Sequence, residues 1–347
     1  MSRSPVRRVA VVGGGIAGLT LAAAVGPDVE VVVHEAQPER WGSGSSLALW
    51  PSAVRALRRL GVMDRLGPHA VPSGPGRLFT LDGRPLTTPH RSPFTVVPRP
   101  ALLEGLRAGL PRRVRVVHAV VDDPADLDAD LVVGADGVRS RVRGLVDPRA
   151  GERRATPYVA LRGTTDAPPD PSEVGEYWGP GRLVGVVPSA RGGYWFTTHR
   201  SDLGPEPLDV RATLAQARTL FADAAPVVRE LLAADADDTT ATRLWTAPPM
   251  RRYAAGRYVV IGDAAHAMTP NLARGAADAV LDAVTLAAEV RAGHSVLRWQ
   301  ARRFPSTQAA RTASSAVMRL ALLDRGHGLR DAALSVVAGV QQRAGSG

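Results

Sequence analysis

The sequence predicts an α/β protein in which a doubly wound, Rossmann-like domain is interleaved with an α+β domain built on an antiparallel sheet, followed by C-terminal helices. Buried, glycine-terminated strands recur near residues 9–12, 131–134 and 258–261, and a helical stretch follows each. Between about residues 156 and 245 the pattern changes to period-two strands. We expect the first domain at 1–72, 97–155 and 249–300, the second at 73–96 and 156–248, and a C-terminal helical segment at 301–347.

The first strand runs directly into a glycine-rich turn, VAVVGGGIAG, at residues 9–18. Gly13, Gly15 and Gly18 occupy the G-x-G-x-x-G positions, where missing side chains let the backbone turn tightly and approach a pyrophosphate. The next helix presents its N-terminal N–H groups to phosphates. The following strand, EVVVHE, ends at Glu35, whose carboxylate can accept hydrogen bonds from a ribose. This order of elements predicts a dinucleotide site.

The same stretch has a superficial likeness to a signal peptide or a membrane span, because three arginines precede the uncharged run Val9–Gly26. Five glycines lie in that run, and no cleavage site is followed by a plausible mature start. A doubly covered parallel sheet also requires an apolar strand and helix. We therefore expect a cytoplasmic protein with no membrane partner.

The composition excludes several kinds of chemistry. There is no cysteine, and all 43 basic residues are arginine, so disulfides, thiolate sites and Schiff-base lysines are absent. The net charge of +10 would permit nucleic-acid binding, but the arginines are scattered among acidic residues without a basic block. We expect no nucleic-acid partner, and a monomer or homodimer.

Two later stretches place an acidic residue at the end of a buried strand. In DLVVGADGVRSRVR, Asp136 can bond a sugar hydroxyl and Gly137 permits close backbone approach, although Asp-Gly is also an ordinary turn. In GDAAHAMTPNLARGAADAVLDA, Asp263 could hold a polyol, and a helix starting near Gly275 would aim its positive end at the preceding loop. His266 fits a packed or capping histidine better than a base, and no metal-ligand spacing accompanies it.

Together the three stretches resemble the FAD-dependent aromatic-hydroxylase family, the single-component flavoprotein monooxygenases of the p-hydroxybenzoate hydroxylase type. The weaker segments LALWPSAVRALRRLGV and PRPALLEGL also look like family segments, and the resemblance extends over residues 6–300. It implies FAD as cofactor, NADPH or NADH as co-substrate, and dioxygen. It implies hydroxylation or epoxidation of an aromatic, polyene-like or otherwise apolar small molecule through a flavin C4a-hydroperoxide.

The resemblance also implies which residues serve the cofactor. They lie in or beside the three motifs: Gly13, Gly15, Ile16, Ala17, Gly18, Glu35, Arg99, Asp136, Gly137, Gly262, Asp263, Pro270 and Gly275. The candidate catalytic residues are Arg162, Arg274 and His266. A pocket that excludes water needs apolar walls, for which we expect four aromatic side chains of the second domain: Trp178, Tyr194, Phe196 and Trp245.

The chain departs from the family pattern in the third motif. Ala267 stands in place of a proline, Ala273 and Arg274 replace a common Gly-Gln, and Leu281 replaces a glutamate. These changes keep open a second hypothesis, a flavin-dependent dehydrogenase, reductase or cyclase without oxygen insertion. A third hypothesis is a nucleotide-binding regulatory module recruited by its arginine-rich surface. The missing lysine argues against flavin-dependent halogenation.

Overall fold

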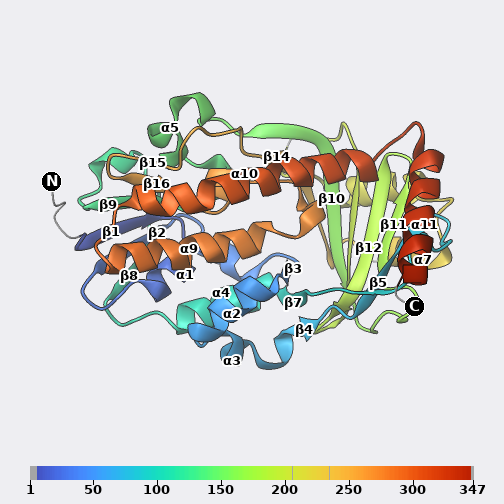
Figure 1. The fold of residues 1–347 in the computed structure, drawn as a ribbon, viewed down its shortest axis with the longest axis horizontal. Coiled ribbons are helices and arrows are strands. Elements are labelled where there is room, and N and C mark those ends of the chain that lie inside the picture. The colour runs from blue at the N-terminus through green and yellow to red at the C-terminus, as the bar shows by residue number, and fades with distance from the viewer. Residues whose placement is uncertain (1–5, 205, 234, 345–347) are drawn as a thin grey trace. The chain divides into compact units, whose positions relative to one another are not determined.

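The computed structural model describes residues 6–204, 206–233 and 235–344, and the chain divides into two compact units (Figure 1). Unit 1 comprises the residues up to Gly67 together with Val97–Arg154 and Trp245–Ser315. Unit 2 comprises Pro68–Val96, Ala155–Leu244 and the residues from Ala316. Each unit is built from three separate stretches of chain, which confirms the predicted class of two interleaved α/β and α+β parts with C-terminal helices.

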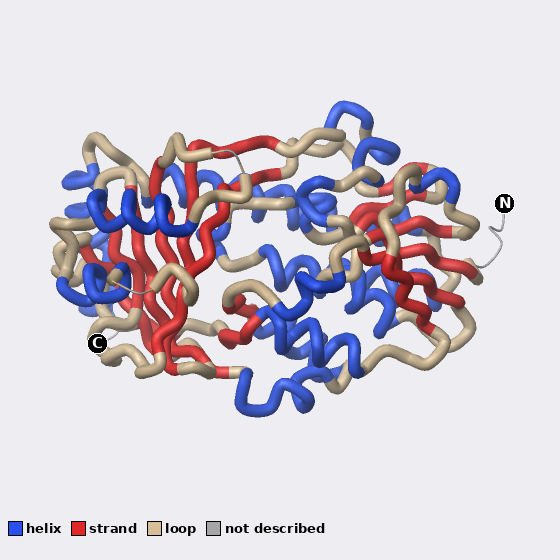
Figure 2. Tube along the Cα trace, turned by 180° about the vertical axis from the view of Figure 1, so that it is seen from behind, coloured by secondary structure: helices blue, strands red, loops and turns tan. Residues whose placement is uncertain are grey.

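Unit 1 is built on a six-stranded sheet with the order β15-β16-β9-β1-β2-β8, whose strands lie side by side in Figure 2. Neighbouring strands are parallel except β15 against β16. The central strand β1 lies between β2 and β9, where the chain order reverses, so this is the switch point of a doubly wound sheet. The strands are β1 (Arg8–Val12), β2 (Glu30–Glu35), β8 (Val114–His118), β9 (Leu131–Gly134), β15 (Ala254–Ala255) and β16 (Tyr258–Val260).

The helices of unit 1 cover this sheet. Helices α1 and α9 pack along one another and carry small apolar residues that are buried on several sides, which explains their weak amphipathic pattern (Figure 1). The helices are α1 (Ile16–Ala24), α2 (Pro51–Arg59), α3 (Val62–Leu66), α4 (Arg99–Ala108), α5 (Val142–Val146), α8 (Asp263–His266), α9 (Gly275–Arg291) and most of α10 (Val296–Ala321). Shorter pieces are η1 (Pro38–Gly42), β3 (Ser46–Leu49), η3 (Pro124–Asp126), η4 (Gly137–Arg139), η5 (Pro148–Ala150) and η6 (Pro270–Leu272); η2 (Gly67–His69) begins at the last residue of this first stretch.

Unit 2 contains a seven-stranded sheet with the order β14-β10-β13-β12-β11-β5-β6. The β10–β13, β13–β12, β12–β11 and β5–β6 pairs are antiparallel, and β11 is parallel to β5. The elements are β4 (Val71–Pro72), β5 (Pro75–Thr80), β6 (His90–Arg91), β7 (Thr95–Pro98), β10 (Arg154–Thr165), β11 (Gly175–Gly179), β12 (Arg182–Ser189), β13 (Gly192–Arg200), α6 (Val210–Leu220), α7 (Pro226–Leu232), β14 (Thr239–Thr246) and α11 (His327–Ala344).

The two faces of this sheet have separate apolar cores, because successive strand residues point to opposite sides. Trp195 is fully buried in a cluster with residues of α6 and α7. Its neighbour Phe196 belongs to another cluster, in which Trp178 packs with Met318 and Leu322 of the C-terminal stretch. Of the aromatic residues expected in a pocket, Trp178 and Phe196 therefore lie on the second face.

Two details differ from the sequence-based expectation. The pattern of residues 210–232 predicts a single helix, but the chain forms α6 and α7, because Pro226 starts a new helix at a position where it could not continue the first. The short extended segments on the two sides of Asp82-Gly83 predict antiparallel strands. β5 does pair antiparallel with the short strand β6, but on its other side it pairs with β11, which runs parallel to it. β7 pairs with β4.

His199 gives unit 2 an acid-sensitive core. It is 1% exposed on β13, with its ring 5.9 Å from that of Phe221, and burial lowers its pKa from 6.5 to about 4. The neutral ring stabilises the fold fully above pH 6.5, and this contribution of up to ~3 kcal/mol is lost as the pH falls towards 4. We expect His199→Leu to flatten the dependence of unfolding free energy on pH in that range, measured by urea titration. The exposed His90→Leu should leave the dependence unchanged; equal slopes for wild type and His199→Leu would contradict the assignment.

Candidate functional site

The three motifs meet at one edge of the six-stranded sheet. Strands β1, β9 and β16 are parallel neighbours, and the register places both Val12 and Val260 beside Gly134. The loops that follow the three strands therefore begin next to one another, and we call this end of the sheet the carboxyl edge. In doubly wound sheets, ligands bind at this edge beside the switch point.

The three glycines of the turn after β1 have different roles. Gly13 has φ +104°, and a Cβ there would lie 2.4 Å from the carbonyl oxygen of Ala135. A Cβ on Gly18 would lie 2.0 Å from the oxygen of Gly13, so this position must also lack a side chain. No atom lies within 4 Å of a Cβ built on Gly15, where α1 begins. The first and third glycines permit packing, and the second leaves the first N–H groups of α1 open to a ligand.

Glu35 lies against this turn at the end of β2. Its Oε2 accepts a hydrogen bond from the N–H of Gly14 at 2.7 Å, and its Oε1 accepts one from Gln37 at 2.8 Å. Trp41 donates from Nε1 to the oxygen of Gly14 at 2.8 Å. The carboxylate is thus fixed beside the glycine turn, and each oxygen can accept a further hydrogen bond.

Arg99 begins α4 and supports a loop of the same unit. Its Nη1 donates to the carbonyl oxygens of Arg40 at 3.0 Å and Ser43 at 2.8 Å. Burial and the neighbouring charge of Arg40 lower the pKa of Arg99. The guanidinium therefore fixes the 40–44 loop in this structure.

We call the loops that follow β1, β9 and β16 at the carboxyl edge the first, second and third corners. The second corner follows β9. Oδ2 of Asp136 accepts a hydrogen bond from the N–H of Arg141 at 2.8 Å, whereas its Oδ1 is buried without a hydrogen-bond partner in the described part of the chain. Burial raises the pKa of this carboxyl. Gly137 has φ +70°, and no atom lies within 4 Å of a Cβ built on it. An acceptor without a donor and an open glycine thus stand next to one another.

Arg143 ties the second corner to the third. Its side chain is fully buried and donates four hydrogen bonds to backbone carbonyls: Nε to Ala150 at 2.6 Å, Nη1 to Ala264 at 3.1 Å, and Nη2 to Val138 at 2.8 Å and Gly151 at 3.1 Å. Val138 lies in the turn after Asp136, and Ala264 lies in α8. One guanidinium therefore fixes both loops at the carboxyl edge.

The third corner follows β16. Gly262 has φ +59°, and a Cβ there would lie 3.1 Å from the Cβ of Ala17 on α1. The next residue, Asp263, starts α8 and has an exposed side chain. A Cβ on Gly275 would lie 3.9 Å from Oδ1 of Asp263, so the start of α9 adjoins this carboxylate. The third corner thus combines an accessible acid with a helix N-terminus.

The loop before α9 contains the departures from the family pattern. Pro270–Leu272 form η6, and Ala273 is left-handed with φ +50°, a conformation that disfavours any residue except glycine. Trp50 donates from Nε1 to the oxygen of Leu272 at 3.1 Å. Arg274 forms two hydrogen bonds with Asp278, from Nε and Nη2, each of 3.0 Å. The charge of Arg274 is therefore compensated within its own helix turn.

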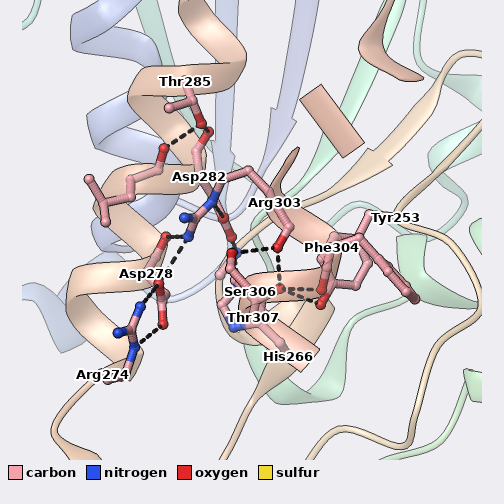
Figure 3. A network of polar contacts seen from close by, with 12 residues as sticks. Tyr253, His266, Arg274, Asp278, Asp282, Thr285, Arg303, Phe304, Ser306 and Thr307 are labelled. Atoms are coloured by element: carbon pink, nitrogen blue, oxygen red, sulfur yellow. Dashed lines mark hydrogen bonds and ion pairs between the residues drawn. The ribbon is translucent and has the colours of Figure 1, made fainter. Parts of the chain in front are cut away.

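His266 lies in the interior of unit 1 (Figure 3). Its Nε2 is 2.6 Å from Oδ2 of Asp282, and its Nδ1 has no hydrogen-bond partner in the described part of the chain. Burial lowers the pKa of His266, but the charge of Asp282, the hydrogen bond to it and the charges of Asp278 and Asp263 together outweigh burial and raise the pKa. The imidazole is thus packed under α8.

Three candidate residues of unit 2 lie on the neighbouring strands β10 and β13. Arg162 is half-buried and donates from Nη1 to Oγ1 of Thr242 at 2.7 Å. Its register partner is Phe196, whose ring lies 6.1 Å from that of Tyr194. Trp245 belongs to unit 1, where the guanidinium of Arg153 covers its ring at 3.3 Å. Arg162, Tyr194 and Phe196 are thus neighbours on β10 and β13.

In the described part of the chain, no group of three or more His, Asp or Glu side chains is arranged to hold a metal ion. Among the helices that the structure describes, none has the length and apolar character needed to cross a membrane.

The sequence also matches known proteins. Residues 110–298, more than half of the chain, match a family model described as "FAD binding domain". A 3-amino-4-hydroxybenzoate 2-monooxygenase of Streptomyces cremeus is 32% identical over 88% of this chain and 84% of its own. The chain belongs to the FAD-dependent aromatic-hydroxylase-type monooxygenases. FAD is thus its cofactor, NAD(P)H is the co-substrate typical of the family, and the predicted monooxygenase function is confirmed.

Two further matches support the family and the fold of this monooxygenase. An aurachin C monooxygenase/isomerase of Stigmatella aurantiaca is 32% identical, with 80% of this chain and 79% of that protein covered. A crystal structure of Klebsiella pneumoniae HpxO, complexed with FAD and uric acid, has a TM-score of 0.82 at 23% identity and covers 96% of this chain and 93% of that one. The last comparison supports the fold.

Arg143, Asp282 and Arg303 of this monooxygenase could not be recognised as site residues from the sequence. Arg143 and Asp282 stand inside the second and third motifs, so the motifs contained the signal. Arg303 lies outside every motif, on α10, and its contacts with α9 depend on tertiary packing.

Replacing Arg143 should destabilise unit 1. Arg143→Gln leaves several buried carbonyls without donors, so we expect the unfolding free energy to fall by about 3–5 kcal/mol in urea titrations. Arg141→Gln is the matched control, because Arg141 lies in the same turn but is 52% exposed and pairs with Asp122; its effect should stay below about 1 kcal/mol. Similar losses for the two variants would show that the carbonyl contacts of Arg143 are dispensable.

Proposed function

We propose that FAD lies along the carboxyl edge of unit 1, with its pyrophosphate on Gly15, Ile16 and Ala17 at the start of α1. The open space at Gly15 supports this position, because no side chain blocks the helix N–H groups there. Glu35, beside the turn, would accept hydrogen bonds from the adenosine ribose. Gly13 and Gly18 contribute by close packing.

The other two corners would hold the rest of the cofactor. Asp136 has a buried oxygen without a donor, and Asp263 has an accessible carboxylate, so both match the hydroxyl groups of a polyol chain. Gly137 and Gly262 permit close backbone approach. The residues present thus fit FAD, with Asp263 assigned to the ribityl hydroxyls.

Bound FAD supplies hydride acceptance from NADPH or NADH and the activation of dioxygen. The chain supplies binding, orientation and electrostatics. The N-terminus of α9, which begins at Gly275, would stabilise negative charge placed beside the loop Pro270–Gly275. Arg274 acts within the protein, since Asp278 already compensates its charge.

The proposed substrate is a small, electron-rich aromatic compound that becomes hydroxylated. Relatives named for 3-amino-4-hydroxybenzoate and 6-hydroxynicotinate support this class. In unit 2, the rings of Tyr194 and Phe196 and the half-buried guanidinium of Arg162 would meet an aromatic ring and an anionic group. A cytoplasmic monomer or homodimer stays the sequence-based prediction.

The decisive experiment follows the oxygen atom. Purified protein reconstituted with FAD is screened with hydroxy- and aminobenzoates, hydroxynicotinates and uric acid while NADH and NADPH consumption is recorded. With the accepted substrate under ¹⁸O₂, mass spectrometry should find one labelled oxygen in the product. Substrate turnover without incorporated label would contradict monooxygenation, and failure to bind FAD would contradict the proposed cofactor site.

Asp263 should dominate the affinity for FAD at the third corner. Asp263→Ala removes an anionic acceptor of polyol hydrogen bonds, each worth about 1.5–3 kcal/mol, so we expect the Kd for FAD to rise at least ~10-fold. Quenching of flavin fluorescence measures the Kd. Asp126→Ala, an exposed acid of the same unit, serves as control and should bind like wild type. An unchanged Kd for Asp263→Ala would place the ribityl chain elsewhere.

A further inference from the structure

Helices α8, α9 and α10 of unit 1 share a row of alternating charges, shown in Figure 3, that we call the ion-pair chain: Arg274, Asp278, Arg303, Asp282 and His266. Arg303 connects the two acids, with Nη2 3.0 Å from Oδ1 of Asp278 and Nε 2.7 Å from Oδ1 of Asp282. The side chains of Asp278, Asp282 and His266 are 0% exposed. Buried charges of this kind persist only where each has a partner.

Asp282 connects the ion-pair chain to the proposed cofactor site. Its Oδ2 lies 2.6 Å from Nε2 of His266 and also accepts a hydrogen bond from the N–H of Gly262 at 3.0 Å. Gly262 precedes Asp263, and His266 ends the short helix that Asp263 begins. One buried carboxylate therefore fixes the chain on both sides of Asp263.

The ion-pair chain is balanced when His266 is neutral, and Asp263 is needed as a further negative charge when His266 is protonated. Arg274 and Arg303 offset Asp278 and Asp282, so a protonated His266 adds one positive charge that the carboxylate of Asp263 can offset. Tyr253 also faces His266, with a ring centroid 6.0 Å away, and burial raises its pKa, so it stays neutral.

The two ionisations favour one another. The side chain of Asp263 is exposed, yet the protein packed around it partly desolvates the carboxyl and raises its pKa, while the charge of His266 lowers it. For His266, burial lowers the pKa, but Asp282, Asp278 and Asp263 together raise it above its ordinary value. A cation at His266 thus favours the carboxylate form of Asp263, and the reverse holds by linkage.

We propose that His266 is a positioning residue for FAD: held as a cation by Asp282, it keeps Asp263 in the carboxylate form that accepts hydrogen bonds from the ribityl hydroxyls. This rests on the proposed function. FAD affinity then falls as the pH is lowered and Asp263 takes up a proton. His266 sets the pH at which that loss occurs, although it never touches the cofactor.

The first test is the pH profile of FAD binding by His266→Gln, with fluorescence quenching at constant ionic strength. Glutamine can still donate to Asp282 but carries no charge, so the acid midpoint of binding should rise by about one pH unit. His294→Gln is the matched control, because His294 also pairs with an acid, Glu289 at 2.7 Å, outside the ion-pair chain. Its profile should coincide with that of wild type, whereas coincident profiles of wild type and His266→Gln overturn the proposal.

A second test does not depend on FAD or on the folding of His266→Gln. The substitution Asp263→Asn changes an exposed side chain, and NMR of ¹³C-labelled histidine follows the titration of His266 in the unliganded protein. Loss of the Asp263 charge should lower that pKa, and an unchanged titration overturns the coupling. A wild type that binds no FAD would refute the proposed function, while this measurement would still decide the coupling.

Discussion

The carboxyl edge depends on one buried guanidinium. The sheet orients β9 and β16, but its ladders end at Gly134 and Val260, so the loops beyond them need another support. Arg143 provides it, because its donors reach Val138 in one loop and Ala264 in the next. Arg143 thus joins the turn after Asp136 to the helix that begins at Asp263, while Asp282 fixes the backbone on both sides of Asp263. The distance between the two acids that we propose for FAD therefore depends in part on the geometry of one planar side chain.

The buried arginines of unit 1 are compensated in two different ways. Arg143 has carbonyl dipoles as its four hydrogen-bond acceptors, and burial lowers its pKa although the charge of Asp136 acts in the opposite direction. Arg303 has two full negative charges, and these outweigh its burial and raise its pKa. Carbonyl dipoles fix orientation with little dependence on pH. The acids around Arg303, in contrast, bring a histidine into the same network, so the third corner acquires a group that titrates.

The sequence predicted the parts of the site that are local and missed those that depend on packing. The β1 turn could be predicted because Gly18 is required by a local contact, with Gly13, although Gly13 in turn packs against the distant Ala135. Arg274 was a candidate catalytic residue, yet Asp278 stands four residues later, a spacing that places two helical side chains together. The contact of Arg303 with Asp282 could not be predicted, since 21 residues and a helix reversal separate them. The parallel pairing of β5 with β11 likewise depends on tertiary packing, because the two strands are far apart in the sequence.

The departures in the third motif form a consistent local structure. Ala273 occupies a left-handed position that costs an alanine roughly 1–2 kcal/mol, so the loop must be held by other contacts. Trp50 provides one by donating to Leu272, and the paired hydrogen bonds between Arg274 and Asp278 provide another on the other side of Ala273. Since Asp278 also binds Arg303, the stiffness of the loop and the charge balance beneath Asp263 depend on the same carboxylate. A substitution of Arg274 would therefore change the charge balance at the third corner through the buried ion pairs, without any contact between Arg274 and a ligand.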